Sequence, residues 1–325
     1  MSEYGEHFIR EIEIKNYKLF KDFKAEGFGR VNLIGGKNNV GKTAFMEACW
    51  INSYSKSIEA LTFVLYSIFI TRNYIEYVDG DMPKEKEVLE KYNNITINSN
   101  YNKIKFNVKK TNGIKEYEVN INHIHNIVNI NKFSFDMDDS ISNIEFIDNV
   151  GFTSDNLKDV FEAVQKHDKE NTLYKYINEF DKNILNFKII GGDKPQCKVT
   201  DGEYRDINEF GDGLKHWISI ICSLYACKDG YLFIDEIDNG LHYTMHDKLW
   251  EIILKISKEQ NVQVFATTHS KECIESFARV AKRLEDDEIG FIELGRNKED
   301  KIRAIVMDSQ RFFRELEVNN EVRGW

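Results

Sequence analysis

The segment Gly36–Thr43, which reads G-K-N-N-V-G-K-T, constrains the fold of this chain more than any other stretch. It fits the P-loop pattern of Gly, four residues, Gly, Lys and then Thr. An apolar stretch, Val31–Ile34, precedes it, and a helix is expected to run from Lys42 to about Asn52. A strand, a glycine turn and a helix N-terminus point several backbone N–H groups at one spot, where the helix dipole adds positive potential. The sequence therefore predicts a binding site for a triphosphate.

The loop residues have separate expected roles, with ATP and Mg²⁺ as the predicted ligands. Lys42 is expected to reach the β and γ phosphates, and the Thr43 hydroxyl to bind Mg²⁺. The alternative is a chance match in a glycine-containing turn, which the strand before it and the helix after it disfavour. The other loop residues expected to bind the nucleotide are Gly36, Asn38, Asn39, Val40, Gly41 and Ala44.

Two acids at the end of a second apolar strand predict the rest of the chemistry. Residues Tyr231–Glu236 read Y-L-F-I-D-E, four apolar residues followed by two carboxylates. A buried parallel strand that ends in acids places them beside a phosphate in α/β folds. We expect Asp235 to hold Mg²⁺ through water and Glu236 to polarise the attacking water as a general base. The alternative, a strand followed by an acidic turn, is disfavoured by the P-loop upstream.

A third apolar strand is expected at Val262–Ala266, and it ends in the polar residues T-T-H-S. A lone histidine is more often an ordinary surface or core residue. His269, however, lies at the tip of this strand, beside the expected phosphate crevice, and is predicted to contact the γ-phosphate. His269, Lys42 and Glu236 form the predicted catalytic set.

Four motifs occur in an order that is typical of one family. The P-loop with Asn38 resembles the Walker A motif of ABC-type ATPases of the SMC and RecF lineage, and G-D-G-L-K-H, which contains Gly211, Asp212 and Gly213, resembles their signature motif. Y-L-F-I-D-E followed by I-D-N-G-L-H resembles their Walker B motif with the D-loop, and A-T-T-H-S resembles their H-loop. Together with I-K-N-Y-K-L-F, D-N-G-L-H-Y and E-V-R, they resemble bacterial AAA family ATPases akin to the ATPase half of the overcoming-lysogenisation-defect (OLD) proteins.

The resemblance implies that the ATP site is completed by a second subunit. Gly211, Asp212 and Gly213 would touch the γ-phosphate of the partner's ATP, and Asp238 would couple the two sites. One copy of each motif makes a homodimer the natural inference. The signature serine of many ABC proteins is replaced here and no Q-loop glutamine is identified, which implies a weaker contact or slower turnover. Heptads of a long coiled coil are absent.

The expected fold class is α/β, a P-loop NTPase of the ABC-ATPase type. It would have a mixed or parallel core sheet flanked by helices, an N-terminal antiparallel portion and an inserted helical subdomain. A single domain, 1–325, is predicted. Its parts are an N-terminal lobe at 1–54, inserted helices, hairpins and a helical subdomain at 55–200, and a lobe with the later motifs at 201–325.

Local patterns predict several further elements. Strands are expected at 8–15 and 16–23, the second with Leu19, Phe20 and Phe23 inward. An antiparallel sheet is expected from 92 to 135, with a hairpin turn at 111–113. Ser154 is expected to cap a helix, and a second helix is expected to extend as far as Ile184.

The composition limits the partners and the location. The net charge of -10 argues against a broad basic surface that grips DNA unaided, although a local patch remains open. The lysines from Lys103 to Lys115 are interpreted as a solvated strand face. The most apolar stretch, Ala60–Ile70, is shorter than the roughly twenty residues that a membrane span needs. Scattered cysteines and an N-terminus without a signal pattern predict a cytoplasmic protein.

Two other clusters contain residue types that can bind metals. His242 and His246 have a spacing that can bind zinc, but no third ligand is evident, so an ordinary structural role is favoured. The acidic run Glu285–Glu288 is interpreted as a solvated loop, and no acidic metal cluster follows His269. The nuclease half of OLD proteins is therefore expected to be missing.

The leading hypothesis is an ATPase whose ATP-driven dimerisation controls a separate effector, a nuclease or a toxin, in anti-phage defence or DNA maintenance. A second hypothesis is an ATP-dependent scaffold that barely turns over. A third is a RecF-like DNA-binding repair ATPase, and a small-molecule kinase is more remote.

Overall fold

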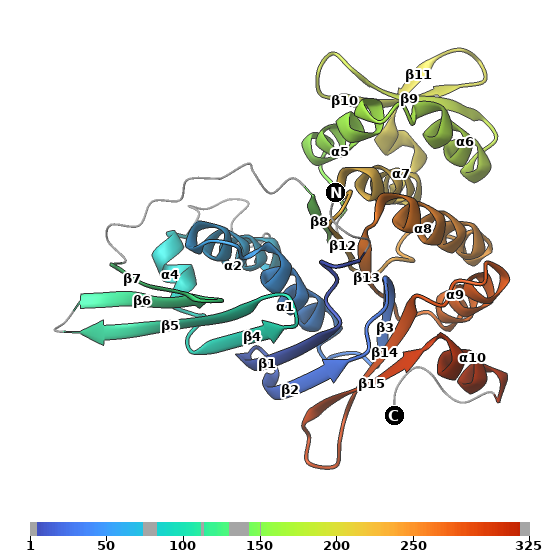
Figure 1. Ribbon diagram of the computed structural model, residues 1–325. Helices are drawn as coiled ribbons and strands as arrows, with labels where there is room; N and C mark the ends of the chain where they lie inside the picture. The colour runs from blue at the N-terminus through green and yellow to red at the C-terminus, as the bar shows by residue number, and fades with distance from the viewer. Residues whose placement is uncertain (1–4, 74–82, 112–113, 130–142, 150, 319–325) are drawn as a thin grey trace.

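The computed structural model describes residues 5–73, 83–111, 114–129, 143–149 and 151–318 (Figure 1). Within these ranges the strands form three sheets. The central sheet has the order β15-β14-β3-β13-β12-β8, with β15 antiparallel to β14 and the other neighbours parallel. Its strands are β3 (Val31–Gly36), β8 (Ile144–Ile147), β12 (Tyr231–Ile234), β13 (Gln263–Thr267), β14 (Ile289–Arg296) and β15 (Ile302–Asp308).

The register of this sheet brings the predicted motifs together. Ile234 lies opposite Ala266, and Ala266 lies opposite Leu33. The carboxyl ends of β12, β13 and β3 therefore meet at one edge of the sheet, where open α/β folds bind their ligands. The acids after β12, the polar residues after β13 and the loop after β3 all emerge there.

The central strands are buried on both faces because their alternate residues enter two separate cores. Val31 and Leu33 belong to one core, and Ile34 and Phe265 belong to the other. This explains why the strands read as continuous apolar runs. The first core contains residues of α7 (Asp212–Ala226), α8 (His246–Gln260), α9 (Lys271–Arg283) and α10 (Ser309–Glu317), and the second contains residues of α1 (Lys42–Tyr54) and α2 (Ile58–Arg72).

A second six-stranded sheet, entirely antiparallel, lies on the far side of α1 (Figure 1). Helix α1 contacts strands of both sheets. The predicted hairpins and the solvated lysine face are confirmed, whereas Leu19 is 48% exposed instead of inward because it lies in the turn between β1 and β2. Part of the turn predicted at 111–113 falls outside the described residues. The sheet comprises β1 (Glu11–Tyr17), β2 (Phe20–Glu26), β4 (Ile95–Ser99), β5 (Lys103–Thr111), β6 (Ile114–Ile121) and β7 (Ile124–Asn129), and α4 (Glu85–Leu89) lies before β4.

A third unit packs above α7, at the top of Figure 1. It contains α5 (Ser154–Lys166), α6 (Glu170–Phe180), β9 (Ile184–Ile190), β10 (Lys194–Val199), β11 (Tyr204–Asp206) and the short helix η2 (Ile207–Phe210). The cap of α5 is Thr153 instead of Ser154, because Thr153 and Asn156 bond reciprocally in a capping box. Ile184 does not continue α6; it begins β9, since the helix ends at Phe180.

The sheets cross the boundaries predicted at 54 and 200. Strand β8 lies in the predicted insertion and yet pairs with β12 in the central sheet. Strand β11 lies beyond residue 200 and yet completes the sheet of β9 and β10. Strands β1 and β4, on opposite sides of residue 54, pair directly. The predicted insertion therefore contributes strands to all three sheets.

The acidic run after α9 is not simply solvated. Asp286 is 8% exposed and forms an ion pair with Arg30, whose side chain is fully buried. Arg30 also donates to the carbonyl of Leu254 at 3.2 Å. This correction reflects a partner 256 positions away in the sequence, which local charge patterning cannot reveal.

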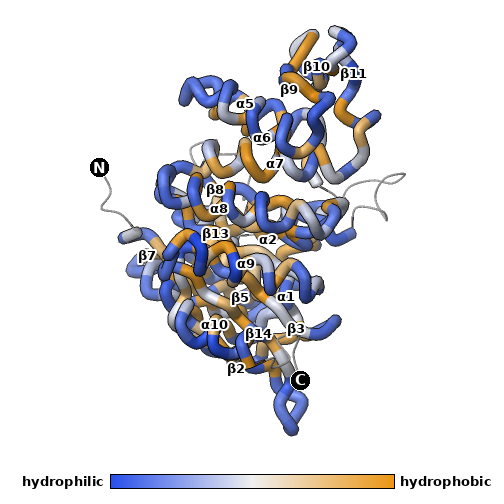
Figure 2. The backbone as a smooth tube through the Cα atoms, turned by 90° about the vertical axis from the view of Figure 1, so that its right-hand side faces the viewer, coloured by the Kyte–Doolittle hydropathy of each residue, from blue (hydrophilic) through white to orange (hydrophobic). Residues whose placement is uncertain are grey.

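The five cysteines are all free and buried, as expected for core thiols. In both views the loop between β14 and β15 projects at the lower end, and it is hydrophilic in Figure 2. No helix in the described part of the chain is long and apolar enough to cross a membrane.

Candidate nucleotide-binding site

The predicted P-loop forms the turn between β3 and α1, and two of its glycines are required by their geometry. Gly36 has a φ of 136°, and a Cβ there would lie 2.3 Å from the carbonyl oxygen of Leu294. Gly41 has a φ of 93° and caps α1, which begins at Lys42. Side chains are strained in this region of φ. The loop therefore takes the tight path that points its N–H groups past the end of β3.

Lys42 is folded back over this loop. Its ammonium group donates to the carbonyl oxygens of Gly36 and Lys37, both at 3.0 Å, and lies 3.2 Å from Nδ1 of His269. Burial lowers the pKa of Lys42 to about 8, although Asp235 and Glu236 oppose the shift. The lysine is therefore protonated at neutral pH and tethered by weak acceptors that a phosphate could replace.

His269 is the histidine that the sequence placed at the tip of β13. Burial lowers its pKa, and the positive charge of Lys42 lowers it further. Because the Lys42 ammonium is a donor only, the facing Nδ1 of His269 accepts, which assigns the proton to Nε2. A neutral histidine with a free Nε2–H suits the predicted contact with a phosphate oxygen.

Thr43 and Asp235 come together as predicted. The Thr43 hydroxyl lies 3.0 and 3.1 Å from the two carboxylate oxygens of Asp235, which also accepts from the Thr267 hydroxyl at 2.6 Å. A hydroxyl and a carboxylate on one spot match the oxygen ligands that Mg²⁺ takes beside phosphates. The residues present thus fit the predicted metal ion.

Glu236 follows directly, with its backbone N–H donating to the Thr267 hydroxyl at 2.9 Å. Its φ is 54°, which is uncommon for a residue other than glycine. Such strained conformations cluster at functional sites. Here the conformation turns the chain just after β12 and places the Glu236 side chain in the same hollow as Lys42.

These residues line a cleft of about 790 Å³. Among the described residues that line it are four cationic side chains and two carboxylates, so the cleft is positive in a chain with a net charge of -10. An anionic ligand is favoured. The lining residues are Lys18, Leu19, Asn38, Asn39, Gly41, Lys42, Thr43, Ala44, Arg72, Asp235, Glu236, Thr267, His269 and Arg296.

Sequence reasoning missed three of these cations. Lys18 lies in the stretch I-K-N-Y-K-L-F, which carries a family resemblance but does not by itself assign a role to this lysine. Arg72 ends α2 and Arg296 ends β14, and nothing in their local sequence marks them. Val40 is buried and, like Gly36, supports the loop without lining the cleft.

The signature residues lie elsewhere. Gly211 and Asp212 are exposed, and neither these two nor Gly213 and Asp238 are among the described residues that line the cleft. Gly213 packs on the loop after β12 so closely that a Cβ would lie 2.1 Å from the carbonyl oxygen of Gly240. The start of α7 and the loop after β12, which the sequence predicted as the signature motif and the D-loop, are thus in close backbone contact and form one block.

Other bonds hold this block. His216 of α7 bonds the carbonyl of Ile237 at 3.2 Å, and burial lowers its pKa. Asp238 accepts from the Thr268 hydroxyl at 2.5 Å. The His216 bond therefore ties the loop after β12 to the first turns of α7.

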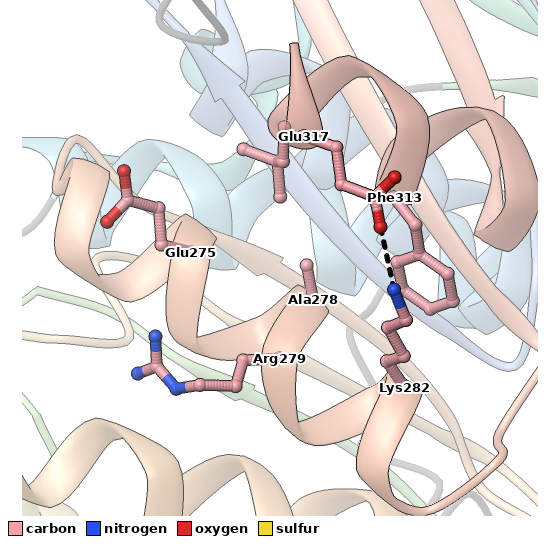
Figure 3. A pocket seen from close by; sticks show the side chains of 7 residues that line it. Glu275, Ala278, Arg279, Lys282, Phe313 and Glu317 are labelled. Atoms are coloured by element: carbon pink, nitrogen blue, oxygen red, sulfur yellow. Dashed lines mark hydrogen bonds and ion pairs between the residues drawn. The ribbon is translucent and has the colours of Figure 1, made fainter. Parts of the chain in front are cut away.

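The remaining candidates gain no support as metal sites. His246 is buried at the start of α8, while His242 precedes the short helix η3 (Tyr243–Met245). The described residues contain no group of three or more His, Cys, Asp or Glu side chains that could hold a metal ion. A second hollow, of about 350 Å³, lies between α9 and α10, where Lys282 and Glu317 pair at 2.7 Å (Figure 3). None of the predicted site residues lines it.

The fold and the cleft define an α/β protein of the P-loop class that binds nucleotides. The chain belongs to the AAA ATPase domain family, whose profile matches residues 71–274, and is accordingly an ATP-binding ATPase. The matched range includes Asp235, Glu236 and His269 and begins after the P-loop.

Individual proteins are similar to this chain over different lengths. An ATP/GTP phosphatase of Helicobacter pylori is 27% identical over 84% of this chain and 88% of its own. The DNA replication and repair protein RecF of Bacillus cytotoxicus is 42% identical over 50 residues, which are 15% of this chain and 13% of RecF. Among solved structures, an SMC head bound to the C-terminal winged-helix domain of ScpA has a TM-score of 0.49 at 12% identity, covering 93% of this chain and 98% of that one.

Proposed function

We propose that this ATPase binds and hydrolyses ATP in the positive cleft, in a site that a second copy of the chain completes. The observation that carries the proposal is the convergence of Lys42, Thr43, Asp235, Glu236 and His269 in one cleft. The residues come from the ends of three neighbouring strands, whose register places them together. This set contains every group that hydrolysis of a triphosphate requires from one subunit.

Each group has a distinct part in the reaction. The oxygen of a water attacks the γ-phosphorus, the bond from that phosphorus to the β–γ bridging oxygen breaks, and the Glu236 carboxylate takes the proton of the water. Lys42 and the Nε2–H of His269 stabilise negative charge on the γ-phosphate oxygens. Thr43 and Asp235 would hold Mg²⁺, which when bound neutralises charge on the phosphates.

The proposed dimer is supported by the position of the predicted signature residues, which do not line the cleft of their own chain. Gly211 and Asp212 are exposed at the N-terminus of α7, where backbone N–H groups favour an anion, yet they lie outside the cleft of their own chain. In an ATP-bound homodimer they would cap the γ-phosphate of the partner's nucleotide. Asp238, in the same block, would couple the two sites.

The role we propose is control of a separate effector, a nuclease or a toxin, in anti-phage defence or DNA maintenance. Its support is the resemblance of the motifs to the ATPase half of OLD proteins. The net charge of -10 gives no support to DNA as the main partner. Five buried free thiols favour a reducing compartment, so we place the protein in the cytoplasm.

The test is release of phosphate from Mg-ATP by the purified protein. We expect Glu236→Gln to lower kcat by about 100-fold or more, the usual contribution of a general base, with ATP binding retained. Glu299→Gln is the matched control, since Glu299 pairs with Lys301 in the exposed β14–β15 loop, and it should not change the rate. GTP is assayed beside ATP because the Helicobacter pylori relative is named an ATP/GTP phosphatase.

The low-turnover scaffold is the second candidate, favoured by the Asp212 carboxylate in the signature loop. It predicts ATP binding with almost no phosphate release in the wild type. Release at rates typical of enzymes, abolished by Glu236→Gln, excludes the scaffold. Absence of both binding and release refutes the proposed function.

A further inference from the structure

A buried carboxylate beneath the cleft holds two of the cations that line it. Glu47 lies one turn after Thr43 on α1 and is 3% exposed. Its Oε1 accepts from Nε of Arg72 at 2.5 Å. Its Oε2 accepts from the Lys18 ammonium, and from the Tyr17 hydroxyl at 3.1 Å. Three separate elements therefore converge on one carboxylate.

The two cations reach Glu47 from distant parts of the chain. Lys18 lies in the turn between β1 and β2, and Arg72 is the last residue of α2. Both have long side chains that lose much rotamer freedom when they are fixed. Neither would keep one orientation at the cleft without an anchor, and Glu47 is an acceptor that they share.

The geometry leaves the cations able to bind a second anion. Glu47 accepts from Nε of Arg72, so the N–H groups of its two terminal nitrogens remain for other acceptors. A planar guanidinium suits phosphate oxygens, and an ammonium acts on them as a point charge. Two cations against one carboxylate also leave a positive charge beside the P-loop. Tyr17 is fully buried, and its hydroxyl donates to the same oxygen of Glu47 as the Lys18 ammonium does.

We propose that Glu47 is a positioning residue, which holds Lys18 and Arg72 in the orientation that contacts the polyphosphate of the bound nucleotide. This inference rests on the proposed function, because it requires the nucleotide in this cleft. The competing explanation is a structural one: Glu47 merely ties α1 to α2 and to the β1–β2 turn. The two explanations differ in what happens to nucleotide affinity when the cations are removed.

The experiment is a double-mutant cycle on the affinity for a non-hydrolysable ATP analogue with Mg²⁺, measured by calorimetry on the full chain. Glu47→Gln keeps the size and helix preference of the side chain and removes its charge. We expect it to raise Kd about tenfold, as interacting residues in one network do. In a Lys18→Met, Arg72→Met background the same substitution should leave Kd unchanged, because nothing remains to be positioned.

A matched control separates positioning from stability. Asp247 on α8 likewise accepts from an arginine, Arg279, and from a hydroxyl, that of Ser276, but it lies outside the cleft. Asp247→Asn should lower the melting temperature and leave Kd unchanged. Glu47→Asp keeps the charge one methylene further back, and we expect a smaller rise in Kd, about threefold, that also vanishes in the double background.

The outcomes are distinct. If Glu47→Gln or Glu47→Asp lowers the melting temperature while Kd stays at the wild-type value, the inference is wrong and the proposed function stands. If Kd rises equally in both backgrounds, Glu47 acts without Lys18 and Arg72, and the inference is again wrong. If the wild type binds no nucleotide, the proposed function fails first and the inference fails with it. Glu47→Asp decides the matter if Glu47→Gln does not fold.

Discussion

At the scale of single residues, the cleft holds two lysines whose charge is weakened by their surroundings. Burial lowers the pKa of Lys42 to about 8, and it lowers the pKa of Lys18 to about 8 although Glu47 opposes the shift. Both values lie far below that of a free lysine, near 10.4. A bound polyphosphate would favour the charged ammonium in each case, so the nucleotide and the proton bind together.

The low pKa values predict that a rise in pH above 8 weakens nucleotide binding and stabilises the fold. Affinity for the ATP analogue should be constant below pH 8 and fall above it, by roughly tenfold per pH unit for each lysine that has lost its proton. In the unfolded chain these lysines keep their protons up to about pH 10.4, so between these pH values the unfolded state binds more protons. The two lysines therefore oppose folding below pH 8, and this destabilisation fades as the pH rises towards 10.4.

The measurement is calorimetric titration of the analogue from pH 7 to pH 9.5. Lys18→Met should make the fall in affinity less steep, since one of the two titrating groups is gone. A Kd that does not change over this range would show that neither lysine holds the phosphates.

At the scale of elements, short-range patterns predicted the parts that surround the site. The P-loop strand, the strand before Asp235 and the amphipathic helix after Gly213 were predicted because their signals lie within a few residues. The pairing of β1 with β4 could not be predicted, since partners in a sheet are set by contacts far apart in the chain. Strand β8 was missed because it has only four residues, too few to show a periodic pattern.

The residues of the site also fall into those that local motifs predict and those that only long-range packing places. Lys42, Thr43 and Asp235 belong to motifs with fixed spacing and were found directly. Arg72 and Glu47 were missed because their roles come from packing between α1 and α2, which no spacing rule describes. The reading of Glu285–Glu288 as solvated failed for the same reason: the anchor of Asp286 is a buried arginine at the start of β3.

The buried ion pair between Arg30 and Asp286 leads to a prediction on the stability of the fold. Asp286→Asn removes the buried charge partner of Arg30 and leaves it the half-exposed Glu288 at 3.6 Å, so we expect a loss of about 2–4 kcal/mol of unfolding free energy, below the full cost of an unpaired buried charge. The measurement is chemical denaturation. Glu285→Gln is the control, because Glu285 is exposed and such changes usually stay within about 0.5 kcal/mol. Since Arg30 and Asp286 lie outside the cleft, affinity for ATP should not change in the folded variant. Equal stability of the two variants would contradict the structural role of the pair.

At the scale of the whole molecule, we propose that each chain supplies one half of each of two ATP sites. The cleft carries the loop, the acids and His269, while the start of α7 and the loop after β12 form a block outside it. In the homodimer that we propose, with two-fold symmetry, each chain would give its block to the other's nucleotide. ATP would then act as part of the interface, and its hydrolysis would loosen the dimer.

The mass of the protein in solution tests this most directly. Glu236→Gln should bind ATP without hydrolysing it, so light scattering should report the chain mass of 38.1 kDa without nucleotide and twice that value with Mg-ATP. Adding Lys42→Ala to the same chain should keep it at the lower mass under both conditions. If Glu236→Gln remains at 38.1 kDa while calorimetry shows its cleft saturated with ATP, the site is complete within one chain and the dimer account is wrong.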